Sequence, residues 1–262
     1  MQRSVPVLRL EYNAVREDQR ILAAEKPIAV SFLGIGYAVM MATPADLEDF
    51  AVGFALSERI IDRTDQIIDL SISEEAEGLL LNVEVSRDRE AVVLSRVRHR
   101  VSESSCGMCG IENLAQALRP LPTVSAPPSL SPQLFFNALG SLASHQPLNG
   151  ATGAVHAAAF FRANGEFVTA REDIGRHNAF DKLIGHGMRS GVDMSDGFAV
   201  LTSRCSYELV EKAALAGITL LVTISAPTTL AVQRAAEASL TLIALARSDS
   251  MLVMSDPYGI FE

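Results

Sequence analysis

The sequence has little of three things: cysteine, long apolar runs and positive charge. Three cysteines among 262 residues are too few for a disulfide framework. No apolar run reaches the roughly 18 residues that a membrane-spanning helix requires. The first residues, MQRSVPVLRLEYNAVRED, alternate apolar with charged side chains and lack the apolar segment of a signal peptide. We therefore expect a cytoplasmic protein that does not bind to or cross a membrane.

The charge balance is acidic. The chain has 22 Lys and Arg residues against 31 Asp and Glu residues, a net charge of −9. This argues against a nucleic-acid polymer as the main partner, although a local basic pocket could still hold a small phosphate-bearing ligand. A hydrophobic content of 48% is normal for a globular protein with a sizeable core.

The first part of the chain predicts short strands around one helix. Apolar residues alternate over 79–85, as in a half-buried strand, and further strands are expected over 5–10, 28–33 and 37–41. Thr43 followed by Pro44 is typical of a helix start, and Leu47, Phe50 and Phe54 then fall on one face. We expect an N-terminal α+β subdomain over 1–118, ending in a loop that contains two cysteines.

A proline-rich segment at 119–132 is expected to be a linker. At its end, Ser131-Pro132 is typical of a helix start, and the remainder, 133–262, continues that helix and then alternates strands with helices. A hairpin is expected around Asn164-Gly165. Strands are then predicted at 198–202, 218–224 and 240–246, with helices at 178–188, 206–216 and 228–238. This order predicts a mostly parallel sheet flanked by helices, whose ligands bind at the carboxyl ends of the strands.

The motif Cys106-Gly107-Met108-Cys109 is the first candidate for chemistry. A basic stretch precedes it at 96–100, and a helix is expected to start near Ile111. Both features stabilise a thiolate, and thiols in such pairs have pKa values of roughly 3.5–7.5 instead of about 8.5. An exposed thiolate can take up a sulfane sulfur and hold it as a persulfide.

Other interpretations of this motif stay open on spacing alone. A structural zinc site would need a second cysteine or histidine pair nearby, and the third cysteine, Cys205, is distant and expected to be buried. A thioredoxin-like pair opens a helix after a strand, whereas here glycines at 107 and 110 indicate a loop. The alternatives for this motif are sulfur carriage, dithiol redox chemistry, structural zinc and no chemistry at all.

Three strand-to-helix turns carry hydroxyl, cationic or imidazole side chains, and they should line one edge of one sheet. Such turns place helix N-termini at a ligand, where free N–H groups bind anions. The candidate ligand contacts in these turns are Asp173, His177, Ser203, Arg204 and Ser225, with Arg176 beside them. The alternative is a salt-bridged surface turn and a plain helix cap at Ser206. We expect Asp181 and Lys182 to be helix surface.

His156 does not indicate a zinc deaminase. Such enzymes use H-x-E followed by P-C-x-x-C, with the glutamate shuttling protons. Position 158 is Ala158, and the cysteine pair precedes the histidine in the chain. Deaminase chemistry is therefore not expected, and His156 is interpreted as a core residue.

Several blocks taken together resemble the FdhD family, the formate dehydrogenase accessory sulfurtransferases. The resemblance runs from about residue 27 to 258. Its blocks are VMMATP at 39–44, DLE at 46–48, CGMCG at 106–110, TG at 152–153, HAAA at 156–159, EDIGRHNAFDK at 172–182, SR at 203–204, SYE at 206–208, SA at 225–226 and TTLAV at 228–232. So many blocks in one order make the resemblance specific.

The resemblance implies a function that spacing alone does not. Members take persulfide sulfur from a cysteine desulfurase and deliver it to the Mo-bis(molybdopterin guanine dinucleotide) cofactor, their bound substrate, which formate dehydrogenase then receives. The carrier position of the family falls on Cys106, with Cys109 as its helper. The resemblance also implies homodimers and a cytidine-deaminase-like α/β fold for 133–262, a mixed sheet with flanking helices, without a metal.

The family's cofactor contact near the C-terminus falls on Leu245, Ala246, Arg247, Ser248, Asp249 and Ser250. Relatives tend to have glycine and a basic residue there, so this chain departs from them and keeps Arg247 as its one cation in the stretch. The leading hypothesis is a sulfurtransferase that carries sulfur on Cys106. The rival is a chaperone that holds the cofactor for formate dehydrogenase without sulfur chemistry, and a dithiol oxidoreductase is the third.

Overall fold

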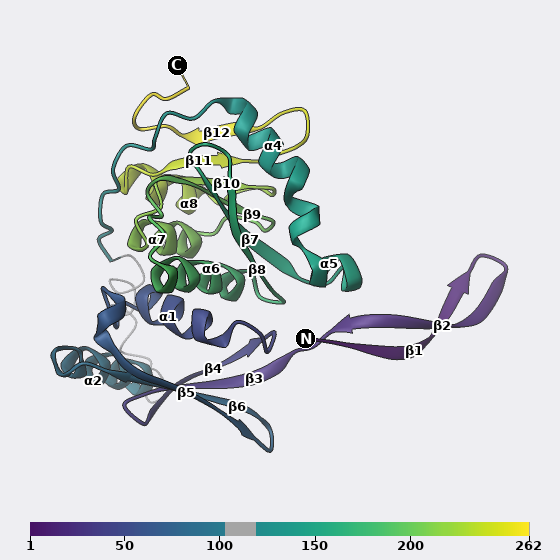
Figure 1. The fold of residues 1–262 in the computed structure, drawn as a ribbon, viewed down its shortest axis with the longest axis horizontal. Helices are drawn as coiled ribbons and strands as arrows, with labels where there is room; N and C mark the ends of the chain where they lie inside the picture. Colours follow the sequence, from purple (N-terminus) through teal and green to yellow (C-terminus); the bar gives the residue numbers. More distant parts are fainter. Residues whose placement is uncertain (103–118, 262) are drawn as a thin grey trace.

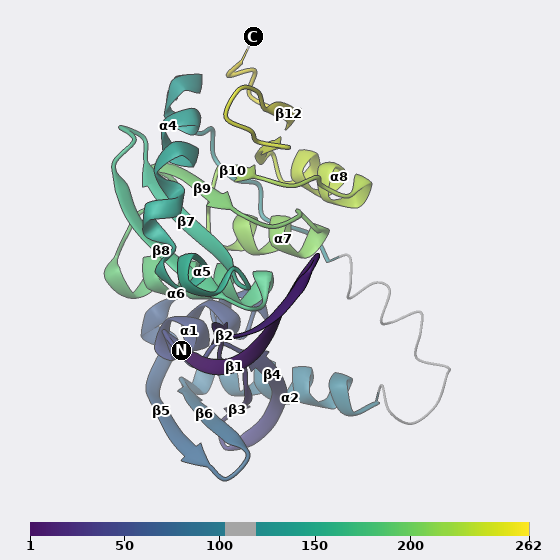
Figure 2. The same cartoon turned by 90° about the vertical axis from the view of Figure 1, so that its right-hand side faces the viewer.

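The computed structural model describes residues 1–102 and 119–261 of the chain. They form three sheets: a two-stranded arm, a four-stranded sheet and a six-stranded sheet, with helices packed between and around the larger two (Figure 1, Figure 2). Cys106 and Cys109 lie outside the described residues. The protein is thus a mixed α/β protein, as the sequence predicts.

The six-stranded sheet has the order β12-β11-β10-β9-β7-β8. Its strands are β7 (His156–Arg162), β8 (Phe167–Asp173), β9 (Gly197–Leu201), β10 (Leu220–Thr223), β11 (Thr241–Ala244) and β12 (Leu252–Ser255). Strands β9, β10 and β11 are parallel, whereas β7 and β12 run antiparallel to their neighbours. The expected hairpin is formed by β7 and β8, with Gly165 at positive φ in its turn.

Both faces of this sheet are covered, since every residue of β9, β10 and β11 is buried and most of them are apolar. One face packs against α6 (Arg176–Ser190), α7 (Tyr207–Leu215) and α8 (Thr229–Glu237). The other packs mainly against α4 (Pro132–Leu142), which the short η2 (Ala143–His145) and α5 (Pro147–Thr152) follow. Alternate residues of one strand enter the two cores: Leu201 lies in the first and Val200 in the second.

The four-stranded sheet has the order β4-β3-β6-β5. Its elements are β3 (Lys26–Phe32), β4 (Ile35–Ala42), α1 (Leu47–Ser57), η1 (Thr64–Gln66), β5 (Ile67–Glu75), β6 (Gly78–Val85) and α2 (Arg87–Ser102). Helix α1 lies between this sheet and α6 (Figure 1). A Cβ at Gly53 would stand 1.8 Å from the carbonyl oxygen of Asp181, and one at Gly185 equally close to that of Asp49. These two glycines let the helices touch, and one apolar core spans both halves of the chain.

Helix α1 begins three residues later than the sequence predicts. Thr43 does not cap it, because its backbone N–H and hydroxyl bind the turn after β8 instead. Asp46, at φ 50°, precedes the first helical residue. Strands β2, β5 and β12 and helices α2 and α5 were not expected from the sequence.

The proline-rich segment has no helix or strand over 119–131, yet it is packed against the body. Val124 is buried, its N–H donates to the Ala238 carbonyl, and its own carbonyl accepts from the Tyr258 hydroxyl. Domain boundaries at 118 and 132 remain a prediction. Over residues 1–102 and 119–261, no helix is long and apolar enough to cross a membrane.

Candidate functional site at the carboxyl edge of the six-stranded sheet

The parallel strands bring the three predicted turns together. The Ser225 N–H lies 3.4 Å from the Ser203 carbonyl oxygen, and the Leu245 N–H lies 3.4 Å from that of Ser225. Strand β8 is antiparallel to β7 and β7 to β9, so the turn after Asp173 reaches the same edge. The expectation that these turns line one edge of one sheet is confirmed.

Cationic side chains gather at this edge. Burial lowers the pKa of His156, and the positive charges of Arg176, Arg204 and His177 lower it further. The sequence suggested that His156 is a core residue, but this is wrong: it is partly exposed, with Arg176, Arg204 and His177 near it. Arg204 is exposed, and the Nε atom of Arg176 is buried without a hydrogen-bond partner in the described part of the chain. The edge is electropositive within an acidic protein.

His177 connects the first turns of two helices. Its Nε2 lies 2.9 Å from Oε2 of Glu208 and 3.3 Å from Oγ of Ser206, both at the start of α7. The hydrogen bond from His177 holds the pKa of Glu208 below its usual value. Helices α6, α7 and α8 all start at this edge, so their free N–H groups and positive dipole ends add to the positive potential.

The stretch 245–250 forms a tight turn at the end of β11. Leu245 has a φ of 51°, and Ala246 is buried. The Arg247 guanidinium donates to the carbonyl oxygens of Ile224 and Ala246, and the Arg247 N–H donates to the Ser250 carbonyl at 2.8 Å. The single cation of this stretch is thus held by the neighbouring turn, while Ser248 and Asp249 are exposed.

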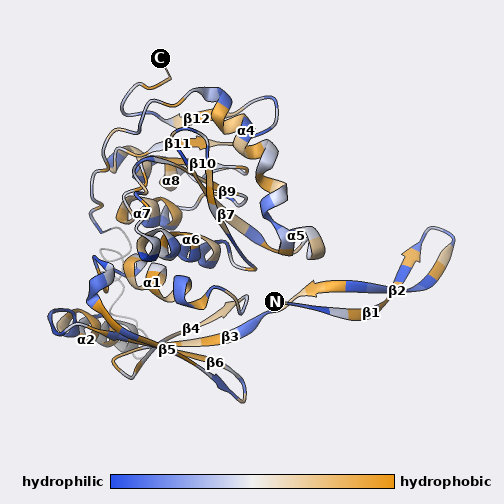
Figure 3. Ribbon diagram, in the orientation of Figure 1, coloured by the Kyte–Doolittle hydropathy of each residue, from blue (hydrophilic) through white to orange (hydrophobic). Residues whose placement is uncertain are grey.

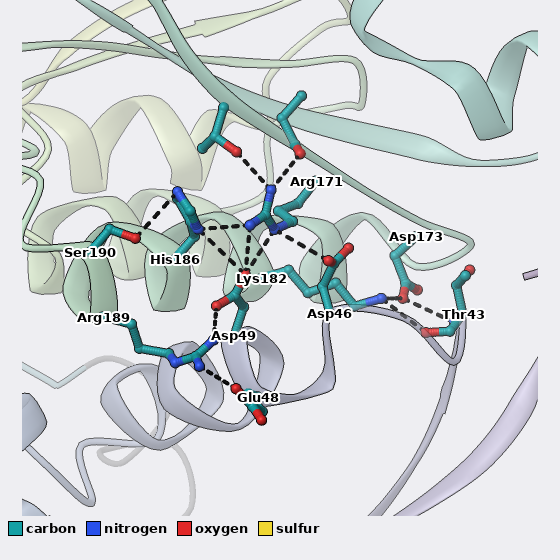
Figure 4. Close-up of polar contacts among 12 residues, drawn as sticks. Thr43, Asp46, Glu48, Asp49, Arg171, Asp173, Lys182, His186, Arg189 and Ser190 are labelled. Atoms are coloured by element: carbon teal, nitrogen blue, oxygen red, sulfur yellow. Dashed lines mark hydrogen bonds and ion pairs between the residues drawn. The ribbon is translucent and has the colours of Figure 1, made fainter.

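Two of the predicted contacts point into the protein. Ser203 is 4% exposed, and its hydroxyl donates to the Arg204 carbonyl at 3.0 Å. Asp173 is fully buried, and its carboxylate accepts from Lys182 at 2.6 Å, Thr43 N–H at 3.0 Å, Gly175 N–H at 2.8 Å and the Asn178 amide at 3.1 Å. Through Gly175 and Asn178 this carboxylate shapes the turn that carries Arg176 and His177. Figure 4 shows Asp173 beside Lys182 and Thr43.

Asp181 and Lys182 are not helix surface, and here the sequence interpretation was wrong. Both are buried, because α1 and α7 cover this side of α6. Lys182 pairs with Asp173, while Asp181 accepts from Lys212 at 2.6 and 2.7 Å and from Ser57 at 2.6 Å. Burial raises the pKa of Asp181 even though Lys212 opposes the shift.

A second charged cluster, missed in the sequence, joins α1 to β8 and α6 (Figure 4). Asp49 is 4% exposed and binds Arg171 Nε at 2.9 Å and Arg189 Nη1 at 2.5 Å. Arg171 also donates to Nδ1 of His186 at 2.7 Å, and burial and this cation lower the pKa of His186. These residues lie more than a hundred positions apart from Asp49, so no local pattern could reveal the cluster.

Cys205 is buried, as expected. Burial raises the pKa of its thiol to about 12, so the thiol stays neutral and unreactive. Cys106 and Cys109 lie outside the described residues, and their roles stay predictions. Across 1–102 and 119–261, no three His, Cys, Asp or Glu side chains stand close enough to hold a metal ion.

Comparison with known proteins identifies the family. The model of the FdhD/NarQ family matches residues 23–261. A sulfur carrier protein FdhD of Xanthomonas euvesicatoria pv. vesicatoria (strain 85-10) is 46% identical over 239 residues, covering 91% of this chain and 85% of the relative. The protein of that name from Variovorax paradoxus (strain S110) is 43% identical, covering 91% and 86%.

A solved structure shares the fold. It is that of a formate dehydrogenase accessory protein from Desulfotalea psychrophila, with a TM-score of 0.75, 21% identity and 98% of each chain covered. The family model and the close relatives together span nearly the whole described chain, including every turn of the electropositive edge. This chain belongs to the FdhD/NarQ family.

Proposed function

We propose that this protein is a cytoplasmic sulfur carrier that takes persulfide sulfur from a cysteine desulfurase on Cys106. It delivers this sulfur to the Mo-bis(molybdopterin guanine dinucleotide) cofactor that formate dehydrogenase requires. Membership in a family whose relatives are named sulfur carrier proteins supports the sulfur chemistry. The observation that carries the proposal is the electropositive edge around Arg176, His177 and Arg204, which suits the phosphates of a dinucleotide.

Both cysteines of the motif take part in the proposed sulfur transfer. The Cys106 thiolate attacks the terminal sulfur of the desulfurase persulfide, which forms a new S–S bond and releases the desulfurase thiolate. When the cofactor is bound, the Cys109 thiolate attacks the Cys106 sulfur, so the terminal sulfur leaves as hydrosulfide for the cofactor. A Cys106–Cys109 disulfide remains and is reduced by cellular thiols before the next cycle.

The geometry of the edge supports separate roles for its residues in holding the guanine dinucleotide. Arg176, whose Nε has no hydrogen-bond partner among the described residues, and the exposed Arg204 fit the phosphates. The partly exposed Ser225 lies between the neighbouring turns. The turn at 245–250 would contact the dinucleotide through its backbone groups, because the Arg247 guanidinium already donates to the carbonyl oxygens of Ile224 and Ala246. Asp173 and Ser203 stabilise the turns from inside.

The family resemblance adds two further parts to the proposal. The order β8-β7-β9-β10-β11, a hairpin followed by parallel strands, supports a cytidine-deaminase-like sheet without deaminase chemistry. We also propose that the protein acts as a homodimer.

Arg204→Ala should weaken the binding of guanosine diphosphate to the purified protein by about 10- to 100-fold, because a charge-assisted hydrogen bond contributes about 1.5–3 kcal/mol. Isothermal titration calorimetry measures the effect. Arg63→Ala is the matched control, since Arg63 is exposed and its guanidinium pairs with its neighbour Asp65. Equal dissociation constants for Arg204→Ala and the unchanged protein would contradict this placement of the phosphates.

The rival function, a cofactor chaperone without sulfur chemistry, uses the same edge. It predicts that formate dehydrogenase activity survives Cys106→Ala in cells and is lost in His177→Ala or Arg204→Ala. Sulfur carriage predicts that all three variants lose the activity.

A further inference from the structure

His156 lies at the end of an apolar strand, at the electropositive edge of the six-stranded sheet. Strand β7 runs between β8 and β9, and His156 is its first residue. The residues that follow, 157–161, are buried, and the middle of the strand is hydrophobic (Figure 3). His156 itself is partly exposed. The strand thus buries its apolar residues and leaves an imidazole where the dinucleotide is proposed to bind.

The β8 side of β7 places this imidazole beside the first turn of the edge. His156 stands opposite Asp173 in the register of the two strands. The Asp173 carboxylate accepts from the Gly175 N–H at 2.8 Å and so holds the turn that carries Arg176 and His177. The imidazole and the start of α6 are therefore neighbours, although they lie about 20 positions apart in the chain.

The β9 side of β7 places the imidazole beside the second turn. The Ala157 N–H donates to the Thr202 hydroxyl at 2.8 Å, and the Thr202 N–H donates to the Ala157 carbonyl at 3.0 Å. Arg204 follows in the same turn and is exposed. His156 consequently stands between the turns that supply Arg176 and Arg204, the two cations that fit the phosphates.

Charged groups from several elements surround this position. Helix α6 contributes Arg176 and His177, and the turn after β9 contributes Arg204. The arm of β1 (Gln2–Glu11) and β2 (Ala14–Ala23) adds Arg20, which donates to the Thr152 carbonyl at 2.8 Å. Nearby carboxylates are already engaged: Asp173 with Lys182, Glu208 with His177, and Glu172 with the N–H groups of Leu148 and Asn149. The position thus keeps an excess of positive charge for an anion.

The imidazole is free to change its charge when such an anion binds. Burial lowers the pKa of His156 below its usual value, and Arg176, Arg204 and His177 lower it further, so the ring is mostly neutral at pH 7. The ring forms no hydrogen bond with another residue of 1–102 or 119–261. A phosphate placed among these cations would favour the protonated ring and raise its pKa.

We propose that His156 binds a phosphate of the guanine dinucleotide in its protonated form, so that ligand and proton bind together. This inference rests on the dinucleotide site proposed above. His177 is less suited to this role, because its Nε2 already lies 2.9 Å from the Glu208 carboxylate. By linkage, the affinity is highest below the pKa of His156 in the free protein. It falls as the pH rises through the higher pKa of His156 in the complex.

Isothermal titration calorimetry of the full chain with guanosine diphosphate mannose tests the proton uptake. This ester keeps the diphosphate but lacks a terminal phosphate, whose second pKa of about 6 would obscure the result. Titrations at pH 6.5 in buffers of different ionisation enthalpy should show uptake of about half a proton. The dissociation constant should rise about three- to tenfold from pH 6 to pH 8, because a shift of one pKa unit corresponds to a factor of ten.

His156→Gln should bind the ester without proton uptake, and its dissociation constant should change less than about twofold over the same pH range. His145→Gln is the matched control. His145 is also partly exposed, but it stacks on Phe167 with ring centroids 3.5 Å apart, outside the edge. This control should take up the proton as the unchanged protein does.

NMR of the histidine rings in the unchanged protein gives a second measurement that needs no variant. With the ring signals assigned through the backbone, the titration midpoint of His156 should rise by about one pH unit when the ester saturates the protein. Binding without uptake, an unchanged midpoint, or uptake that persists in His156→Gln would overturn the inference and leave the dinucleotide site intact. No binding of the ester between pH 6 and pH 8 would overturn the dinucleotide site itself, and this inference with it.

Discussion

Lys182→Met should lower the free energy of unfolding by about 3–5 kcal/mol, the cost of leaving one member of a buried ion pair alone. Lys182 and Asp173 are both 0% exposed, with Nζ and Oδ2 2.6 Å apart. The methionine side chain fills the space of the lysine but cannot neutralise Asp173 or donate to the Thr43 carbonyl, which Lys182 binds at 2.9 Å. Urea unfolding at pH 7, followed by circular dichroism, measures the change.

Lys26→Met is the matched control for this prediction. Lys26 pairs with Glu74 at 3.0 Å, but the two side chains are 43% and 74% exposed. An exposed pair contributes at most about 1 kcal/mol, so this variant should be nearly as stable as the unchanged protein. The double variant Asp173→Asn/Lys182→Met should recover part of the loss, because no buried charge remains. A Lys182→Met protein within 1 kcal/mol of the unchanged one would contradict the role of the pair.

This ion pair connects the fold to the proposed function. Asp173 binds the Gly175 N–H and the Asn178 amide, so it fixes the turn that positions Arg176 and His177. Asp173 accepts a hydrogen bond from the Thr43 N–H, and Lys182 donates to the Thr43 carbonyl. The pair therefore binds the segment before α1 and joins both halves of the chain. A destabilised Lys182→Met protein should consequently also bind guanosine diphosphate less tightly.

The second half of the chain could be predicted from the sequence because its signals are local. Strands β9, β10 and β11 are short, mostly apolar runs, and β9 and β10 are each followed by a polar turn and an amphipathic helix. Parallel strands then place those turns at one edge whatever the details of packing. The backbone contacts between the turns at Ser203, Ser225 and Leu245 follow from this order of strands alone.

The remainder depends on contacts between distant segments. Asp181 and Lys182 are charged residues on a helix, and the packing of α7 and the close crossing of α1 at Gly53 and Gly185 bury them. The pattern Thr43-Pro44 suggested a helix start, but Asp173, 130 positions away, binds Thr43 instead. The pairing of β1 with β2 in the arm was not predicted either, because β2 mixes charged with apolar residues and lacks a buried face.

Cys106→Ala should abolish formate dehydrogenase activity in cells that depend on this protein, whereas Cys205→Ala should support it. Alanine removes the sulfur that would carry the persulfide, and no described thiol can replace it, because Cys205 is 0% exposed with a pKa raised to about 12. Enzyme assays on extracts, with immunoblots for equal amounts of each variant, measure the effect. Full activity with Cys106→Ala would favour the cofactor chaperone.

Sulfur carriage itself is tested most directly by mass spectrometry of the intact purified protein after incubation with a cysteine desulfurase and cysteine. The unchanged protein and Cys205→Ala should each gain the mass of one sulfur atom, which a thiol reductant then removes. Cys106→Ala should gain nothing. A Cys106→Ala protein that still gains one sulfur atom would contradict the account, because the carrier would then be another residue.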